Sequence, residues 1–114
     1  MSTAFVAEDQ LDLIFHALAN RTRRALLARL KRGPAKVTDL AEPFGVSLNA
    51  VSKHLLVLED AGLVERTIKG RIHLCALRAG PMASAEAWIG TYEDFWGGTL
   101  DKLADFVENN MDQA

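Results

Sequence analysis

Hydrophobic side chains recur every three or four positions along most of this chain, which is the spacing of one face of an α-helix. In the first half, the pattern predicts helices over residues 8–18, 21–32, 39–44 and 48–61. The side chains expected to face inward are Leu11, Ile14, Phe15, Leu18, Leu26, Leu27, Leu30, Val51, Leu55 and Leu58. This part of the chain is therefore predicted to be helical, with one face of each helix turned toward a core.

Polar residues and glycines mark the ends of these helices. Asn20 and Ser47 each precede a helix, where the side chain can accept a hydrogen bond from a free backbone N–H. Gly33-Pro34 and Gly62 follow two of the helices and are typical stop signals. Gly45 lies in the tight connection between the third and fourth helices, so these two helices form a helix-turn-helix pattern.

A β-hairpin is predicted directly after the fourth helix. β-branched and apolar residues cluster in the segment LVERTIKGRIHLCAL, around Lys69-Gly70. Glycine at this point can take the positive φ that a tight hairpin needs. The segment predicts two strands with a basic tip, and Ala79-Gly80-Pro81 then breaks the chain.

The tail, from about residue 82 to residue 109, is predicted to be helical and apolar on more than one side. One stripe contains Trp88, Tyr92, Phe95, Thr99, Leu103 and Phe106, and another contains Ile89, Trp96, Leu100 and Val107. One stripe can serve the chain's own core, whereas the second needs another surface. Gly90, Gly97 and Gly98 mark a kink, a break into two helices or a close backbone approach, and the pattern leaves these alternatives open.

The order of elements is helix, helix, helix-turn-helix, hairpin, helix, which is the layout of a winged helix-turn-helix. The fold class predicted is mainly α with a small β-hairpin, dimerising through the first and last helices. The length of 114 residues suits a single domain over 1–114, with a C-terminal dimerisation helix or helices over about 82–110. We expect a cytoplasmic protein, because one cysteine, Cys75, fits a reducing compartment and no signal-like or membrane-spanning run is seen.

Charge is unevenly distributed along the chain. The formal net charge is -2, which by itself argues against nucleic acid. Residues 21–73, however, carry 11 Lys or Arg against 5 Asp or Glu, whereas residues 74–114 carry 2 against 7. A basic centre between acidic ends is a patch, and patches decide electrostatic binding.

The second helix of the helix-turn-helix is the expected recognition helix, because in this layout it can enter the major groove of DNA. The residues predicted to contact DNA from its start and its outer face are Ser47, Leu48, Asn49, Ser52 and Lys53. Asn49 can pair with adenine edges, Ser52 and Lys53 can reach a base or a phosphate, and Leu48 can touch a thymine methyl. The alternative is an ordinary solvated helix face.

The hairpin supplies the second group of candidates. Arg66, Lys69 and Arg71 suit contacts to phosphate or the minor groove, which add affinity but little sequence information. The alternative for them is a solvated hairpin tip. For the arginines that open the second helix, Arg21, Arg23 and Arg24, we favour a structural or solvated role over DNA contact.

The segment VTDLAEPFGVSLNAVSKHLLVLEDAGLVERTIKGRIHLCAL resembles the core of ArsR/SmtB-type repressors, and the likeness extends from about Leu11 to Leu77. Its most specific parts are Val51-Ser-Lys-His54-Leu55, Ala61-Gly62-Leu63-Val64 and Gly70-Arg71. The resemblance implies a dimeric repressor that releases double-stranded DNA when a signal arrives. It also implies that His54 touches the DNA backbone or orders the recognition helix, and a packed, hydrogen-bonded histidine is an equal alternative.

Metal ligands are where the sequence departs from that family's best-known members. Lys36 and Thr38 occupy the positions of a Cys-x-Cys pair, and neither is a thiolate ligand. Only His73 and Cys75 share a predicted strand face, and two ligands fall short of a four-coordinate zinc site. We therefore expect no metal site and no cofactor, in keeping with a branch of the family that lacks the known metal ligands.

Two further hypotheses remain beside DNA binding as a repressor. One is a winged-helix protein-interaction module that does not bind DNA, which the negative net charge favours. The other adds a redox or small-molecule sensor, with Cys75 as the thiol. An enzyme is not expected, because the three histidines fall in three elements and no nucleophile or phosphate-binding motif is found.

Overall fold

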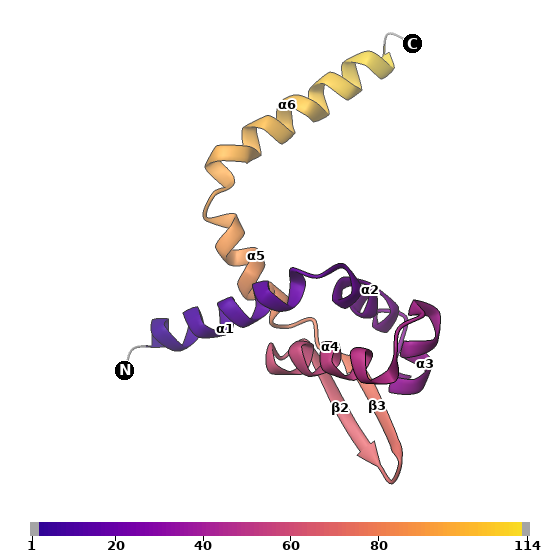
Figure 1. The fold of residues 1–114 in the computed structure, drawn as a ribbon. Coiled ribbons are helices and arrows are strands. Elements are labelled where there is room, and N and C mark those ends of the chain that lie inside the picture. The colour runs from indigo at the N-terminus through magenta and orange to yellow at the C-terminus, as the bar shows by residue number, and fades with distance from the viewer. Residues whose placement is uncertain (1–2, 113–114) are drawn as a thin grey trace.

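Figure 1 shows the computed structural model, which describes the backbone of residues 3–112 and the side chains of residues 8–97 and 102–110. The elements are α1 (Thr3–Leu18), α2 (Arg21–Leu30), β1 (Ala35–Lys36), α3 (Val37–Ala41), the 3-10 turn η1 (Glu42–Phe44), α4 (Leu48–Asp60), β2 (Val64–Lys69), β3 (Ile72–Leu77), α5 (Met82–Gly90) and α6 (Glu93–Asp112). The predicted winged helix-turn-helix is confirmed. Within the described residues, no helix is both long and apolar enough to cross a membrane.

Both predicted N-terminal caps are present. The Asn20 side chain accepts a hydrogen bond from the Arg23 backbone N–H at 3.0 Å, at the start of α2. The Ser47 hydroxyl accepts one from the Ala50 N–H at 3.1 Å, at the start of α4. These bonds fix where the two helices begin, and in α4 they fix which residues form the first turn.

Predicted helix boundaries were wrong at the start of the first helix, at the end of the second, which is Leu30 rather than residue 32, and at both ends of the third. The first helix begins at Thr3 rather than residue 8, because the preceding residues contain no Gly or Pro to stop a helix even though they lie outside the clear apolar repeat. The third helix begins at Val37, which is buried with Leu40, rather than at residue 39. Its end is a 3-10 turn containing Pro43, which has no N–H for an α-helical hydrogen bond.

The sheet has three strands in the order β1-β3-β2, all antiparallel, so the predicted hairpin is joined by a strand that the sequence pattern did not reveal. Strand β1 has only two residues, which are too few to show the alternation of apolar and polar positions that identifies a strand. Ala35 pairs with Cys75, and both are buried, so β1 attaches the segment before α3 to the base of the wing.

The core lies among α1, α2, α3, α4 and the base of the sheet. Its largest fully buried side chains are Ile14, Leu26, Leu40, Val51, Leu55, Leu58, Leu63 and Cys75. The wing, β2 and β3, projects from this body on the side away from α5 and α6 (Figure 1).

The tail is two helices, with α5 packed on α1 and α6 extending away from the body (Figure 1). The break follows Gly90, whereas α6 runs through Gly97 and Gly98. Aromatic rings form a chain of contacts from α1 to the break between α5 and α6. The ring centroids of Phe15 and Trp88 lie 5.5 Å apart, and those of Trp88 and Tyr92 lie 5.2 Å apart. The side chains of Thr99 and Leu100, assigned above to the two stripes, lie outside the described residues.

The end of α4 depends on a left-handed glycine. Gly62 has φ 76°, its N–H donates to Glu59 O at 2.9 Å, and the next N–H, of Leu63, donates to Leu58 O at 2.9 Å. This pair of bonds is the Schellman arrangement, which satisfies two carbonyls at the end of the helix. It turns the chain from the recognition helix directly into the wing.

Gly62→Ala is expected to lower the free energy of unfolding by about 1–2 kcal/mol, because an L side chain is disfavoured at this φ. A Cβ there would meet Pro81 Cγ at 3.4 Å, an ordinary contact, so the cost is conformational rather than steric. Urea denaturation at one fixed protein concentration measures it. The control is Gly80→Ala, where a Cβ has no neighbour within 4 Å; equal stability of the two variants would contradict the prediction.

Candidate nucleic-acid interface

Helix α4 has one buried face and one exposed face, as the sequence predicted. Val51, Leu55 and Leu58 are fully buried on the inner face. The exposed residues near its start and on its outer face are Ser47, Leu48, Asn49, Lys53 and Leu56, and Ser52 is half-buried beside them. Because the inner face is held by the core, the outward direction of these side chains is fixed by the fold.

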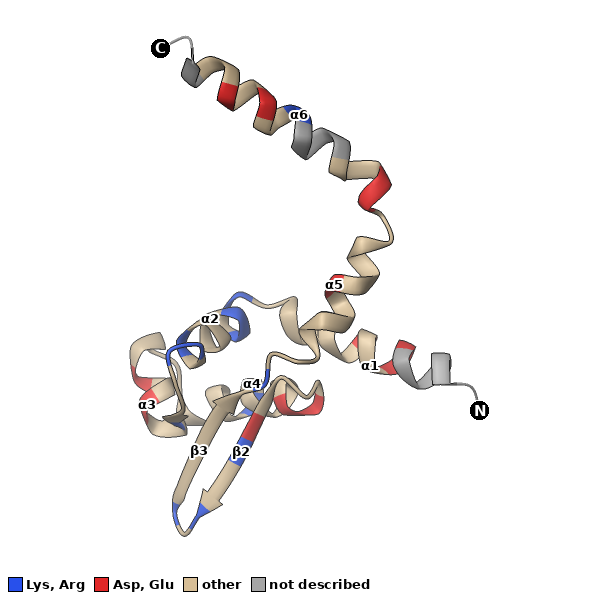
Figure 2. Ribbon diagram, turned by 180° about the vertical axis from the view of Figure 1, so that it is seen from behind, with Lys and Arg blue, Asp and Glu red and all other residues tan. Residues whose placement is uncertain are grey.

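The wing carries its basic residues at the tip. Lys69 and Arg71 are exposed on either side of Gly70, which has φ 62°. Figure 2 shows this blue tip at the end of the hairpin, far from the acidic residues of α6. The two cations are therefore free to meet an anionic surface.

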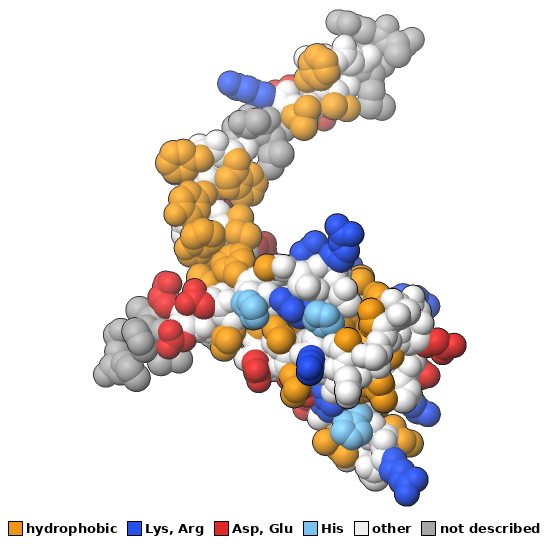
Figure 3. All heavy atoms as spheres, in the orientation of Figure 1, with side chains coloured by type: hydrophobic (Ala, Val, Ile, Leu, Met, Phe, Trp, Pro, Cys, Tyr) orange, Lys and Arg blue, Asp and Glu red, His pale blue; other side chains and the backbone are white. Residues whose placement is uncertain are grey.

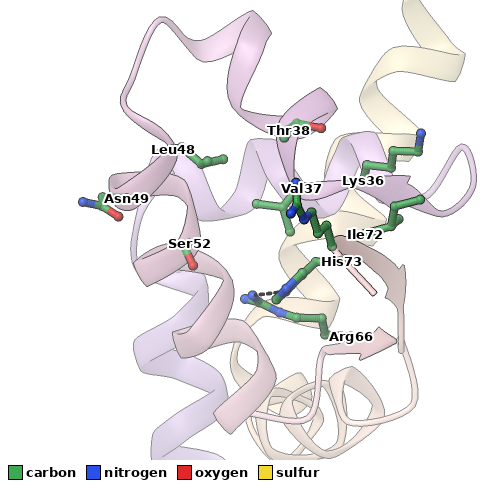
Figure 4. A pocket seen from close by; sticks show the side chains of 10 residues that line it. Lys36, Val37, Thr38, Leu48, Asn49, Ser52, Arg66, Ile72 and His73 are labelled. Atoms are coloured by element: carbon green, nitrogen blue, oxygen red, sulfur yellow. Dashed lines mark hydrogen bonds between the residues drawn. The ribbon is translucent and has the colours of Figure 1, made fainter. Parts of the chain in front are cut away.

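A hollow of about 460 Å³ lies between the start of α3, the start of α4 and the wing. Its lining residues are Lys36, Val37, Thr38, Leu48, Asn49, Ser52, Arg66, Arg71, Ile72 and His73 (Figure 4). The sequence predictions Leu48, Asn49, Ser52, Arg66 and Arg71 thus come together, whereas Ser47, Lys53, His54 and Lys69 do not line it. A concave surface that combines apolar side chains with the three cations Lys36, Arg66 and Arg71 suits the sugar-phosphate backbone of a nucleic acid strand.

Lys36 and Thr38 are the lining residues that sequence reasoning missed as members of this surface. They were considered only as positions lacking thiolate ligands. The short strand β1 pairs Lys36 with Leu74 of β3. This pairing brings Lys36, and with it Thr38, beside the wing. The signal in the sequence was the Lys-Val-Thr segment, with one cation and one hydroxyl, at the start of the helix-turn-helix.

Arg66 differs from the two cations at the wing tip because it is already paired. Its Nε and Nη2 donate to the two carboxylate oxygens of Glu59 on α4, each at 3.0 Å, and its Nη1 donates to His73 Nδ1 at 3.3 Å. The side chains of Arg66 and Glu59 are only 12% and 22% exposed. This two-point bond joins β2 to the C-terminal part of the recognition helix, so Arg66 holds the wing as well as lining the hollow.

His54 is half-buried and lies on the side of α4 that faces α2. Its Nδ1 accepts a hydrogen bond from Arg23 Nη1 at 3.3 Å. His54 is therefore a packed, hydrogen-bonded histidine in this structure. Arg23 and Arg24 have the structural role expected for them, because both donate to carbonyls at the end of α1.

Cys75 is fully buried beneath the wing. Burial raises the pKa of the Cys75 thiol, and the nearby Arg66 opposes this to a smaller extent. A buried, protonated thiol is a poor nucleophile and a poor metal ligand, so the geometry disfavours a redox sensor at this position. Among the side chains that the structure describes, no three of the types His, Cys, Asp or Glu converge on one point.

A second surface, apolar rather than basic, covers the tail. In Figure 3 hydrophobic side chains cover α5 and the described parts of α6. Phe95, Phe106 and Leu103 are 82%, 64% and 58% exposed on α6, and Trp96 and Val107 are also exposed. An exposed apolar area of this extent marks a site of association.

Comparison with known proteins gives consistent results. Residues 18–67 match the model of a family described as a helix-turn-helix domain. The HTH-type transcriptional regulator Rv2034 of Mycobacterium tuberculosis is 35% identical over 90% of this chain and 94% of its own length. The transcriptional repressor SdpR of Bacillus subtilis is 30% identical over 69% of this chain and 88% of its own length.

Solved structures give the same result. The ArsR family transcriptional regulator RHA00566 superposes with a TM-score of 0.74 at 43% identity, over 79% of this chain and 93% of that one. The homodimeric winged helix-turn-helix DNA-binding domain Mb0332 of Mycobacterium bovis superposes with a TM-score of 0.63 at 28% identity, over 85% and 93% of the two chains.

Glu59→Gln is expected to lower the free energy of unfolding by about 1–2 kcal/mol, because it removes one charge of a mostly buried pair and leaves the other. In the same variant, amide hydrogen exchange in β2 and β3 should become faster, because the ion pair between Arg66 and Glu59 that joins the wing to α4 is weakened. The control is Glu65→Gln, which breaks the 2.6 Å pair with Arg78. That pair is largely exposed, so its loss should change stability by less than about 1 kcal/mol; equal effects would show that the Glu59 pair does not hold the wing.

Proposed function

Because this chain belongs to the ArsR family of winged helix-turn-helix transcriptional regulators, we propose that it binds duplex DNA sequence-specifically and acts as a dimeric repressor. The single observation that carries the proposal is the hollow between the start of α4 and the wing. Base-reading side chains form one wall of it and basic side chains form the other. Relatives named as regulators and a repressor support the same function.

The proposed roles follow from the chemistry of each side chain. Asn49 and Ser52 read base edges in the major groove, and Leu48 contacts a thymine methyl. Lys53, Lys69 and Arg71 neutralise phosphates. Ser47 caps the recognition helix, Arg66 fixes the wing, and His54, half-buried on the side of α4 that faces α2, contacts the DNA backbone.

We further propose that residues 1–114 act as one domain whose α1, α5 and α6 form the dimer interface; residues 1–2 and 113–114 lie outside the described part. The radius of gyration is 18.6 Å, whereas a compact chain of this length is expected near about 13 Å. The difference reflects α6, whose apolar side is left uncovered by its own body. A second copy of the chain is the natural cover, and Mb0332 is described as homodimeric.

The family is one of transcription regulators rather than enzymes, and the absence of catalytic activity remains a prediction. The cytoplasm remains the expected location. An interaction module that does not bind DNA is the competing hypothesis, and DNA-binding measurements separate the two.

Asn49→Ala and Ser52→Ala are each expected to reduce discrimination between a selected duplex and random DNA, by about 1–3 kcal/mol where a base contact is lost. The measurement is fluorescence anisotropy with a duplex enriched by the wild-type protein from a random-sequence pool. Asn109→Ala, an exposed substitution on α6, is the matched control. Undiminished discrimination in both variants would place the recognition surface elsewhere.

Arg71→Ala is expected to weaken specific and random DNA binding alike and to reduce the slope of log affinity against log salt by about 1, because one phosphate contact is lost. Lys102→Ala on α6 removes one positive charge far from the wing and serves as control. If no salt-dependent binding to any duplex is found with the wild-type protein, the interaction module becomes the better hypothesis.

The wild-type protein is expected to have a mass near twice 12.5 kDa by light scattering at micromolar concentration. Leu103→Glu combined with Phe106→Glu should shift the mass toward the monomer, because two exposed apolar side chains of the proposed interface become charged. Glu108→Ala on the polar side of α6 should leave the mass unchanged. A monomeric wild-type protein would contradict the proposed dimer.

A further inference from the structure

Arg23 is unusual among the charged residues of this chain because it is buried. Arg23 is only 9% exposed, and among the described side chains no other charged residue is buried. Neither of the ion pairs found in the described part of the chain involves it. A buried guanidinium without a carboxylate must be satisfied in another way, and the fold provides this.

The end of α1 supplies the first part of the answer. Arg23 Nε donates to Ala17 O and Nη2 donates to His16 O, both at 2.8 Å. These carbonyls belong to the last turn of α1, where backbone carbonyls lack partners within the helix and carry partial negative charge. The guanidinium therefore both caps α1 and has its own charge stabilised.

The recognition helix supplies the second part. Arg23 Nη1 lies 3.3 Å from His54 Nδ1. A guanidinium can only donate hydrogen bonds, so Nδ1 must be the acceptor in this contact. The ring hydrogen is then carried by Nε2, which has no hydrogen-bond partner within the part of the chain that the structure describes.

We propose that Arg23 is a positioning residue of the DNA-binding surface, which fixes the His54 ring and its tautomer so that Nε2–H is offered as a donor to a DNA phosphate. This inference rests on the proposed function. The contact adds a directional hydrogen bond without adding net charge, unlike Lys53 beside it. Through the same guanidinium, the last turn of α1, a helix of the proposed dimer interface, is tied to the recognition helix.

The first experiment measures the tautomer directly in the wild-type protein without DNA. Nitrogen-15 chemical shifts of the histidine rings distinguish the protonated ring nitrogen from the acceptor nitrogen. The expected result for His54 is hydrogen on Nε2 and an acceptor at Nδ1. Hydrogen found on Nδ1 would overturn the proposal, whether or not the protein binds DNA.

The second experiment separates positioning from stability. Arg23→Met removes every donor, and on the selected duplex it should lower affinity roughly 5- to 20-fold, as expected for weakening one hydrogen bond to a charged group. In a His54→Ala background, Arg23→Met should lower affinity no further but should still lower the melting temperature. Additive losses of affinity would overturn the proposal, because the two residues would then act independently.

Arg24→Met is the matched control, because Arg24 also caps α1, donating to Leu18 O at 2.7 Å, but has no contact with His54. It should lower the melting temperature slightly and leave the His54 tautomer unchanged. If Arg23→Met does not fold, Arg23→Lys serves in its place, since one ammonium cannot reproduce the bonds to α1 and to His54 together. Failure of the wild-type protein to bind any duplex would count against the proposed function, while the ring shifts still decide the tautomer.

Discussion

The burial of the inner face of α4 is the constraint on which the rest of this structure depends. Val51, Leu55 and Leu58 are wholly removed from solvent, so α4 cannot rotate about its axis without exposing them. The side chains on the outer face of α4 therefore have a fixed orientation, pointing away from the core. The surrounding elements hold the two ends of the helix: Ser47 fixes its start, and the turn through Gly62 leads its end into the wing.

The basic surface and the overall acidic charge are compatible because they lie on different parts of the molecule. The positive side chains gather on α2 and at the tip of the wing, whereas most acidic ones lie on α1, α3, α5, α6 and the C-terminal end of α4, with Glu65 on β2 away from the tip (Figure 2). Screening at physiological salt limits the reach of each charge to about 8 Å. A strand of DNA in the hollow would therefore respond to Lys36 and Arg71 rather than to the net charge.

Local signals in the sequence predicted the helices, the two caps and the tight turn of the hairpin, because each depends on a few neighbouring residues. The outward face of α4 was predicted for the same reason. The features that the sequence did not predict depend on contacts between residues that are distant in sequence. Strand β1 exists only because Ala35 meets Cys75, and the pairing of Arg66 with Glu59 depends on how the wing leaves α4. The periodicity of hydrophobic residues predicts neither of these two contacts.

The positions of the two tryptophans have a spectroscopic consequence. Trp88 and Trp96 are the whole tryptophan content of the chain, and both lie on the tail, partly exposed, whereas the hollow beside the wing contains no aromatic ring apart from the His73 imidazole. Intrinsic emission is therefore a native reporter of the α5–α6 region and is blind to direct contact at the recognition helix. A change in emission on adding a duplex would signify communication between the two ends of the molecule, with no label introduced.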